Sequence, residues 1–314
     1  MARFVTLALN PAIDETIELD ALVPGTVNIA RGMLRHAAGK GINVAACLAD
    51  SGVEVTATGL LGEANDELFR ALFAAKRIND RCARIPGATR TNIKLLDRAT
   101  GATTDINLPG EAPSPASLDQ ALAALHEAAG LDGVAVLSGR LPPGVPADVY
   151  AQQVATLRSH RARVVLDASG AALDAALAAQ ALPHAIKPNR QELEAWAGES
   201  LPDLPALLRV ARAVAARGVG LVVVSMGAEG AIFVTAQQAV GVRPPSRAAT
   251  SSVGAGDAMV AGIATGLADD LPLDALARRA AAFSAAKLQA IGPNLPGRAE
   301  VEAIAASLPV EPLA

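Results

Sequence analysis

Short apolar runs alternate along the chain with longer amphipathic segments that are rich in alanine. The runs consist mainly of β-branched residues or leucine and are bounded by glycine, proline or aspartate, which is typical of buried strands. We expect these strands at residues 4–9, 53–58, 134–137, 163–167, 185–187 and 221–225. The amphipathic segments predict helices at 42–49, 66–75, 118–128, 147–158, 173–179, 204–216, 255–268, 274–290 and 298–307. This alternation predicts an α/β fold with a mostly parallel central sheet and helices on both faces.

Two segments, 16–22 and 83–108, have a different residue pattern, in which Thr, Asn, Asp and Ile alternate without a helical period. We interpret them as antiparallel strands of a small sheet beside the main one, formed by the regions 12–35 and 83–109. The Pro- and Gly-rich segment 109–115 returns the chain to the main body. We therefore expect a single domain over residues 1–314.

The composition excludes several classes of protein. Of the 314 residues 51% are hydrophobic but only 2% are aromatic, and 27 Lys and Arg against 31 Asp and Glu give a net charge of −4. A binder of single-stranded nucleic acid needs aromatic platforms and a basic groove, so we expect no nucleic-acid partner. A disordered chain has low hydrophobicity and high net charge, and this chain has neither.

The cysteines, the histidines and the lengths of the apolar runs argue against Cys- or His-ligated metal sites, secretion and membrane insertion. The two cysteines, Cys47 and Cys82, are far apart, which argues against a zinc knuckle or a disulfide framework and is compatible with a reducing cytoplasm. The four histidines show no metal-ligand spacing. The first apolar run is too short for a signal peptide, and no run approaches the ~20 residues that span a bilayer. We expect a cytoplasmic protein without a membrane segment.

The strongest candidate for a functional site is the turn SVGAGD at 252–257, which precedes a predicted helix. Two glycines let the backbone bend around a ligand, and the first-turn amides of the helix make an anion site. Asp257 at its mouth has two interpretations: a carboxylate that complements the helix dipole, or a base that takes a hydroxyl proton during phosphoryl transfer.

Two nucleotide-binding motifs do not match the chain. A dinucleotide fingerprint needs a third glycine where Met259 stands, which counts against a nucleotide-dependent oxidoreductase. A Walker loop needs glycine at the position of Leu34 and Ser or Thr at the position of Gly41, so Lys40 is not a P-loop lysine.

The segment from Ser252 to Gly262, which includes the turn, resembles the C-terminal signature of the ribokinase-like (PfkB) carbohydrate kinases. The N-terminal signature of that family is similar to AGKGINVA at 38–45. Further similarity lies in LNPAID at 9–14, KPNRQE at 187–192 and SMGAEG at 225–230. The resemblance covers nearly the whole chain through five motifs in order, and it implies a ribokinase-like fold in which the small sheet is a lid over the substrate.

The resemblance also implies a reaction, the ATP-dependent phosphorylation of a sugar phosphate. Asp257 would be the general base, and the amides of Gly254, Ala255 and Gly256 would stabilise charge on the transferring group. Stretches at 36–43, 104–107 and 188–198 are similar to bacterial 1-phosphofructokinases, which implies conversion of fructose 1-phosphate to fructose 1,6-bisphosphate. Tagatose-6-phosphate kinases and 6-phosphofructokinases of the same family share much of this pattern and stay open as alternatives.

By resemblance, the sugar phosphate is bound by Asp14, Gly39, Lys40, Asn43, Arg90 and Ser138. Lys40 and Arg90 are the candidates for its existing phosphate, since Arg engages phosphate bidentately and Lys acts as a point charge. Arg140 departs from the family pattern, which has Ser at that position, and its role stays open between a phosphate contact and a solvated charge.

The nucleotide side follows from the same resemblance, which assigns it to Lys187, Asn189, Ser225, Gly227, Gly230, Ser252, Gly254, Gly256 and Ser284. Asn189 and Glu192 would organise hydrated Mg²⁺, and they also have the spacing of a helix capping box. Both roles can hold together. Whether a monovalent cation also binds near the anion site, as in some relatives, is left open by the sequence.

Two further expectations concern class and assembly. A sugar-phosphate sensor on a kinase fold does not need a base, so the presence of Asp257 argues for an enzyme. By resemblance, two lid sheets pair between subunits and cover each other's apolar faces, which predicts a homodimer.

Overall fold

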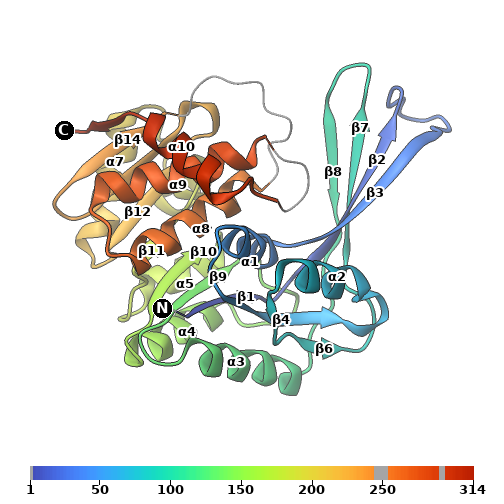
Figure 1. Ribbon diagram of the computed structural model, residues 1–314, viewed down its shortest axis with the longest axis horizontal. Helices are drawn as coiled ribbons and strands as arrows, with labels where there is room; N and C mark the ends of the chain where they lie inside the picture. Colours follow the sequence, from blue (N-terminus) through green and yellow to red (C-terminus); the bar gives the residue numbers. More distant parts are fainter. Residues whose placement is uncertain (1–2, 244–253, 290–293) are drawn as a thin grey trace.

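The computed structural model describes residues 3–243, 254–289 and 294–314, and within them the larger sheet has eleven strands (Figure 1). Seven parallel strands make its centre, in the order β12 (Leu221–Ser225), β11 (Ala185–Ile186), β10 (Arg163–Asp167), β9 (Val134–Ser138), β1 (Phe4–Ala8), β4 (Val55–Gly62) and β5 (Asn79–Asp80). A short strand, β6 (Ala83–Ile85), also pairs with β4 in parallel. All six strands that the apolar runs predict are present.

Beyond β12 the sheet continues with three antiparallel strands that the sequence reading did not predict. They are β13 (Ala231–Val234), β14 (Ala239–Val242) and β15 (Val310–Pro312). Short connections join β12 to β13 and β13 to β14, and they give antiparallel pairs instead of the helical crossover that a parallel pair needs. The strand β15 joins this edge from far along the chain, at residues 310–312. The sequence pattern predicted no strand after residue 225, so this antiparallel edge was missed.

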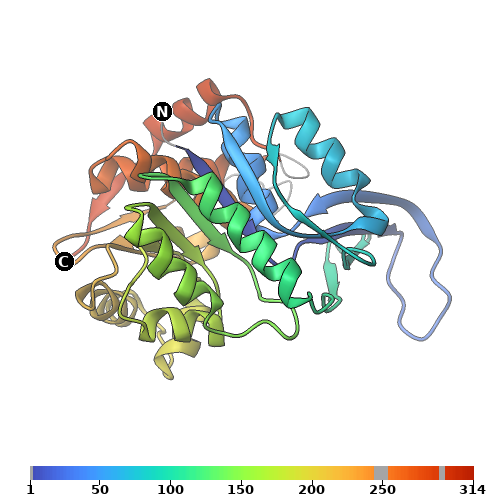
Figure 2. The same cartoon turned by 90° about the horizontal axis from the view of Figure 1, so that it is seen from below.

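Both faces of the central strands are apolar, because neighbouring side chains along a strand point to opposite sides. Phe4 and Ala8 belong to one core, whereas Val5 and Leu7 belong to the other. The first core is covered by α1 (Lys40–Asp50), α2 (Glu67–Lys76), α8 (Ala255–Ala268), α9 (Leu273–Lys287) and α10 (Arg298–Ser307). The second is covered by α3 (Pro115–Ala129), α4 (Val149–Ser159), α5 (Ala171–Ala178), α6 (Arg190–Ala197) and α7 (Leu204–Ala216), several of which face the viewer in Figure 2. The expectation of helices on both faces is confirmed.

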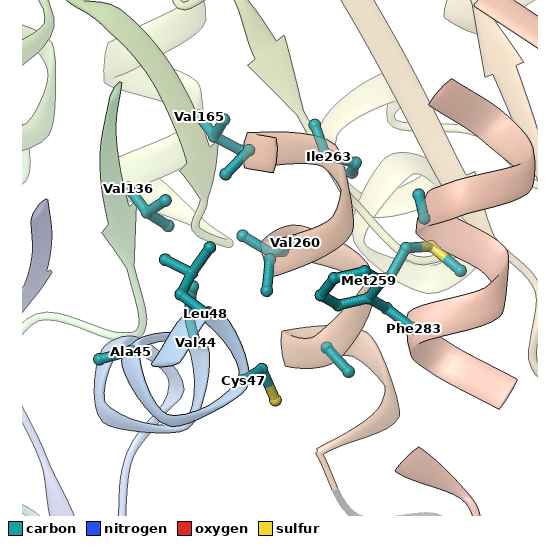
Figure 3. Close-up of a cluster of buried hydrophobic side chains, with 14 of the residues drawn as sticks. Val44, Ala45, Cys47, Leu48, Val136, Val165, Met259, Val260, Ile263 and Phe283 are labelled. Carbon is teal, nitrogen blue, oxygen red and sulfur yellow. The ribbon is translucent and has the colours of Figure 1, made fainter. Parts of the chain in front are cut away.

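The helix α8 lies at the centre of the first core and carries the candidate base on its first turn. Val260 and Ile263 of α8 face Val136 and Val165 of the sheet in Figure 3. A Cβ on Gly262 would lie 2.6 Å from the Cα of Ala280, so a glycine is required where α8 crosses α9. This packing fixes the start of α8 relative to the strands.

The small sheet has the order β3 (Ala30–Ala38), β2 (Ala12–Leu19), β7 (Thr91–Asp97) and β8 (Thr103–Asn107), and it projects from the main body in Figure 1. Its central pair, β2 and β7, is parallel, so the expectation of antiparallel strands throughout was wrong. Both strands leave the main body just after a strand of the large sheet, and they therefore run outward in the same direction. Residues 83–85, which were expected in the small sheet, belong to the large one.

In the portion of the chain that the structure describes, no helix has the length and apolar character needed to cross a bilayer.

Candidate active site

The candidate site lies at the carboxyl ends of the parallel strands, where α1 and α8 begin. Both helices start at a glycine with positive φ, Gly39 at 112° and Gly254 at 80°, and neither glycine offers a side-chain cap. First-turn amides without a side-chain cap remain able to bind an anion. Gly39 also lies so close to Pro11 that an added Cβ would be 2.7 Å from its Cα. The packing against Pro11 therefore gives Gly39 a structural reason besides the expected approach of the sugar.

Asp257 is buried on the first turn of α8, at the mouth of the glycine turn Gly254–Gly256. Asn43 of α1 donates a hydrogen bond from Nδ2 to Asp257 Oδ2 at 2.7 Å. Burial, together with the negative charge of Asp167, raises the pKa of Asp257 to about 6, although the Asn43 hydrogen bond acts in the opposite direction. A carboxylate with a pKa in this range is suited to accept a proton near neutral pH.

The centre of the site is Asp167, a residue that the sequence reading did not single out. It ends β10, is only 1% exposed, and receives three groups that were predicted to bind substrate or nucleotide. Lys40 Nζ lies 3.1 Å from its Oδ2, Lys187 Nζ lies 3.4 Å from its Oδ1, and Ser138 Oγ donates to Oδ2 at 3.4 Å. The available signal was an aspartate at the carboxyl end of a buried strand.

The two lysines keep the carboxylate of Asp167 charged. Burial opposes its ionisation, but the ammonium groups of Lys187 and Lys40 outweigh burial and hold the pKa of Asp167 below its ordinary value. Lys187 is also close to the glycine turn, since a Cβ on Gly256 would lie 3.5 Å from its Nζ. The cluster therefore holds an ammonium group beside the backbone that would meet the phosphate.

Asn189 and Glu192 form the capping box at the start of α6. Asn189 Oδ1 accepts from the Glu192 amide at 2.8 Å, and Glu192 Oε2 accepts from the Asn189 amide at 2.9 Å. The other oxygen, Oε1, lies 4.0 Å from Lys40 Nζ and faces the cluster around Asp167. One carboxylate oxygen at a phosphate site fits hydrated Mg²⁺, which is held by few protein ligands together with phosphate oxygens.

The remaining nucleotide-side residues lie further along the sheet. Ser225 ends β12 and pairs with Asn189 through an isolated parallel bridge, so these two are brought together. Gly227 and Gly230 have positive φ angles of 60° and 95° in the turn that follows. A Cβ on Gly230 would lie 2.1 Å from Val242 O, which gives this glycine a packing role against β14. Ser284 lies in α9, and Ser252 lies outside the residues that the structure describes.

A second polar cluster lies on the small sheet. Asp14 of β2 is paired with Asn92 of β7, which donates from Nδ2 to Asp14 Oδ1 at 3.0 Å. Lys94 Nζ lies 3.2 Å from Asp14 Oδ2. Asn92 and Lys94 were not predicted as site residues; the signal was their alternation in the run TNIKLL. The hydrogen bond from Asn92 and the ion pair with Lys94 therefore fix the orientation of the Asp14 carboxylate.

Arg90 joins this cluster to the loops of the main body. Its Nη1 donates to Asn92 Oδ1 at 2.6 Å and its Nη2 donates to Asn10 O at 3.1 Å. Burial is the main reason that the pKa of Arg90 is lowered, and the charge of Arg140 acts in the same direction. Arg140 is exposed on the loop after β9, and it forms no ion pair with another of the described residues. The guanidinium groups of Arg90 and Arg140 add positive charge where the small sheet joins the main body.

The comparisons with known proteins agree on one family. Residues 7–299 match the pfkB family carbohydrate kinase. The chain belongs to this family. It is 52% identical over 288 residues to the 1-phosphofructokinase of Xanthomonas campestris pv. campestris, with 91% of each chain covered. It is 46% identical over 313 residues to the 1-phosphofructokinase of Rhodobacter capsulatus, covering 99% of this chain and 98% of the relative.

A solved structure of phosphofructokinase-2 from Escherichia coli, in complex with potassium, has the same fold. The TM-score is 0.91 at 29% sequence identity, and the match covers 98% of this chain and 99% of the other. The expected ribokinase-like fold and the carbohydrate-kinase class are thereby confirmed, and so is an ATP-dependent phosphotransferase as the kind of enzyme.

Proposed function

We propose that this protein transfers the γ-phosphoryl group of ATP to fructose 1-phosphate and forms fructose 1,6-bisphosphate and ADP. The observation that carries the proposal is the buried Asp257, with a pKa of about 6, at the mouth of a glycine turn with uncapped helix amides. The names of the two curated relatives support the sugar phosphate. The free primary hydroxyl of fructose 1-phosphate is on C6.

In this reaction the C6 oxygen forms a bond to the γ-phosphorus while the bond from that phosphorus to the β,γ-bridging oxygen breaks. Asp257 accepts the hydroxyl proton, and ADP leaves with the bridging oxygen. Asn43 orients the carboxylate of Asp257 through its 2.7 Å hydrogen bond. The amides of Gly254, Ala255 and Gly256, together with the ammonium of Lys187, bind charge on the transferring group.

Recognition of the sugar phosphate is proposed to divide between the two clusters. Asp14, fixed by Asn92 and Lys94, accepts from sugar hydroxyls, and Arg90 binds the existing phosphate. Lys40 lies 3.1 Å from Asp167 and 4.0 Å from Glu192, so its charge is already shared on the ATP side. We therefore place the acceptor's phosphate at Arg90 rather than at Lys40.

Magnesium is proposed as the metal, with Glu192 Oε1 as its protein oxygen and Asn189 beside it. When bound, it would neutralise charge on the ATP phosphates. The chain's own part is to hold Glu192 by the capping box, so that one carboxylate oxygen is fixed and the other faces the phosphates.

A monovalent cation is proposed not to be required. The structure of the Escherichia coli relative contains potassium. In this chain the ammonium of Lys287 lies beside Gly254 and supplies a unit positive charge from the protein itself. Replacing K⁺ by tetramethylammonium is expected to leave kcat unchanged, and a fall in kcat would contradict this.

The assay that tests the function measures ADP release with fructose 1-phosphate, fructose 6-phosphate and tagatose 6-phosphate, with and without Mg²⁺. We expect the highest kcat/KM with fructose 1-phosphate and no turnover without Mg²⁺. A preference for either 6-phosphate would overturn the choice of substrate. Absence of turnover with all three would support a sensor instead of an enzyme.

A homodimer through the small sheet is proposed on the basis of its strand register. Pairing places Ile17, Met33, Ile93, Leu95 and Ile106 on one face and Asp14, Asn92 and Lys94 on the other. Met33 and Ile106 are exposed in the single chain. A large exposed apolar face is typical of a contact surface, and the same face of a second copy is complementary to it.

A further inference from the structure

The buried ammonium of Lys287, proposed above to make a monovalent cation unnecessary, has no part yet in the phosphoryl-transfer step itself. Lys287 is the last residue of α9 and is only 3% exposed. A Cβ built on Gly254 would lie 3.2 Å from its Cε and 3.9 Å from its Nζ. The ammonium group, which comes from the end of α9, therefore lies beside Gly254 at the start of α8.

The surroundings of Lys287 make a positive charge there costly. The N-terminus of α8 already carries a partial positive charge, and burial lowers the pKa of Lys287. Among the described residues, the charge of Lys287 is influenced by Cys47 on α1, Asp257 on α8 and Lys76 on α2. Burial raises the pKa of the Cys47 thiol far above its ordinary value, so Cys47 stays neutral.

Asp257 is thus the carboxylate that faces Lys287, and it is itself surrounded by charge. Asp167 of β10 raises its pKa, while Lys40 and Lys187 lower it. A positive charge beside the turn favours the ionised form of Asp257 and also favours an anion at the amides of the turn. A phosphoryl group bound at these amides would be attracted by the ammonium.

We propose that Lys287 is a positioning residue that supplies a fixed positive charge beside Gly254, where it stabilises the charge of the transferring phosphoryl group and favours the ionised form of Asp257. This inference rests on the proposed function in one respect, namely that the anion at the turn is a phosphoryl group of ATP. If Lys287 only filled space between α8 and α9, removing its charge would change stability but would not change kcat or its pH dependence.

The experiment compares Lys287→Met, which keeps the length of the side chain and removes its charge, with Lys287→Arg, which keeps the charge. Lys76→Met is the matched control, because Lys76 is a second lysine in the same region that pairs with Asp50 at 2.6 Å and does not contact the turn. For each protein kcat, KM for both substrates and the pH dependence of kcat are measured.

For Lys287→Met we expect kcat to fall on the order of tenfold to a hundredfold, with KM for the sugar phosphate unchanged. The acidic limb of its pH profile is expected to move to higher pH, because Asp257 loses a nearby positive charge. Lys287→Arg is expected to restore most of kcat, and Lys76→Met to lower the melting temperature without changing the pH profile. Wild-type kcat and an unshifted pH profile in Lys287→Met would overturn the proposal.

A binding readout separates this proposal from the choice of substrate. Inorganic phosphate is expected to raise the melting temperature of the wild type and of Lys287→Arg more than that of Lys287→Met. If the wild type turns over none of the three sugar phosphates, the proposed function fails, yet this difference in phosphate stabilisation still tests Lys287. Equal stabilisation of all three proteins would contradict the proposed charge. If Lys287→Met does not fold, the same measurements on Lys287→Gln decide.

Discussion

At the scale of single residues, the site depends on carboxylates whose ionisation is set by their neighbours. Asp257 and Asp167 are both buried and both near lysines, but their pKa values are displaced in opposite directions. Asp167 has direct ammonium partners, whereas Asp257 has a neutral amide donor and a carboxylate nearby. The environment therefore suits Asp167 to organise the lysines and suits Asp257 to its proposed role as the proton acceptor.

Asp257→Asn should remove the base while it retains the fold. We expect kcat to fall roughly a hundredfold to ten-thousandfold, with the affinity for ATP preserved. In the wild type, kcat should fall as the pH decreases through about 6, because protonated Asp257 cannot accept the hydroxyl proton. Steady-state kinetics and ATP binding by calorimetry provide the measurements, and near-normal turnover of the variant would exclude Asp257 as the base.

The same substitution carries a prediction for stability, with a definite sign. The folded-state pKa of Asp257 lies above the ordinary value of 3.8, so the buried charge destabilises the fold at neutral pH and the penalty is lost as the pH falls through about 6. Asp257→Asn should therefore melt at a higher temperature than the wild type at pH 8. The difference should shrink toward pH 5, and a variant that is less stable at both pH values would contradict the burial argument.

Asp167→Asn tests the residue that the sequence reading missed. Removing its charge takes away a cause of the raised pKa of Asp257, so the acidic limb of kcat should move to lower pH. Lys40 and Lys187 also lose their shared carboxylate, and KM for ATP is expected to rise. The pH profile and KM are measured together, with Tyr150→Phe, a buried hydroxyl that donates to Gly139 O, as the control. An unshifted acidic limb would argue against the coupling of the two carboxylates.

Most site residues around Asp167 and Asp257 could be predicted from the sequence, because they lie in motifs. Lys40, Asn43, Lys187, Asn189, Glu192 and Asp257 were all selected from the sequence. Asp167 was missed because an aspartate that ends a strand is common and belongs to no motif, and its importance arises only from the groups that reach it. Asn92 and Lys94 were missed for a similar reason, since they support Asp14 across two strands.

At the scale of elements, the two helices whose first turns meet at Asn43 and Asp257 begin without the side-chain caps that begin α3, α6 and α7. Ser114 and Asp203 cap α3 and α7 by accepting from backbone amides at 3.1 and 2.9 Å. By contrast, α1 and α8 begin at Gly39 and Gly254 without such caps. A helix that gives up a cap loses stability, and packing has to compensate for it.

The contact between α8 and α9 provides that packing, and Gly262→Ala tests it. In an isolated helix this change would stabilise by about 1 kcal/mol, but here the new methyl group meets the backbone of Ala280. We expect the free energy of unfolding to fall by about 1–3 kcal/mol instead. Denaturant unfolding gives the measurement, with Gly297→Ala as the control, since nothing lies within 4 Å of a Cβ there. A stabilised Gly262→Ala would contradict the close crossing.

The positions of helices and strands were well predicted where the hydrophobic period is clear. They were poorly predicted where a strand exists only because it pairs with another strand. The strand 163–167 and the helix 204–216 match the structure residue for residue. The strands β13 to β15 were missed, and the direction of β7 relative to β2 was wrong. Strand pairing joins residues far apart in the chain, so it leaves little trace in the local pattern.

At the scale of the whole molecule, the small sheet has one face that carries Asp14, and an opposite face where exposed apolar side chains surround the ion pair of Glu15 and Arg35. Met33→Lys combined with Ile106→Lys should convert the proposed dimer to a monomer, because a buried unpaired ammonium is costly. Thr103→Lys, on the face of the same sheet that carries Asp14, is the control. Sedimentation velocity at micromolar concentration distinguishes the two states, and a wild type that is already monomeric would disprove the dimer.

The sequence by itself determined the α/β class, the family and most of the residues proposed for the site, because buried strands, glycine turns and helix caps are local patterns. Only the tertiary structure decided which side chains share a charge. It placed Lys40, Lys187 and Ser138 around Asp167, and it placed Lys287 beside Gly254. The physical reason is that a pKa and an ion pair depend on distance and burial in space, and neither quantity follows from separation along the chain.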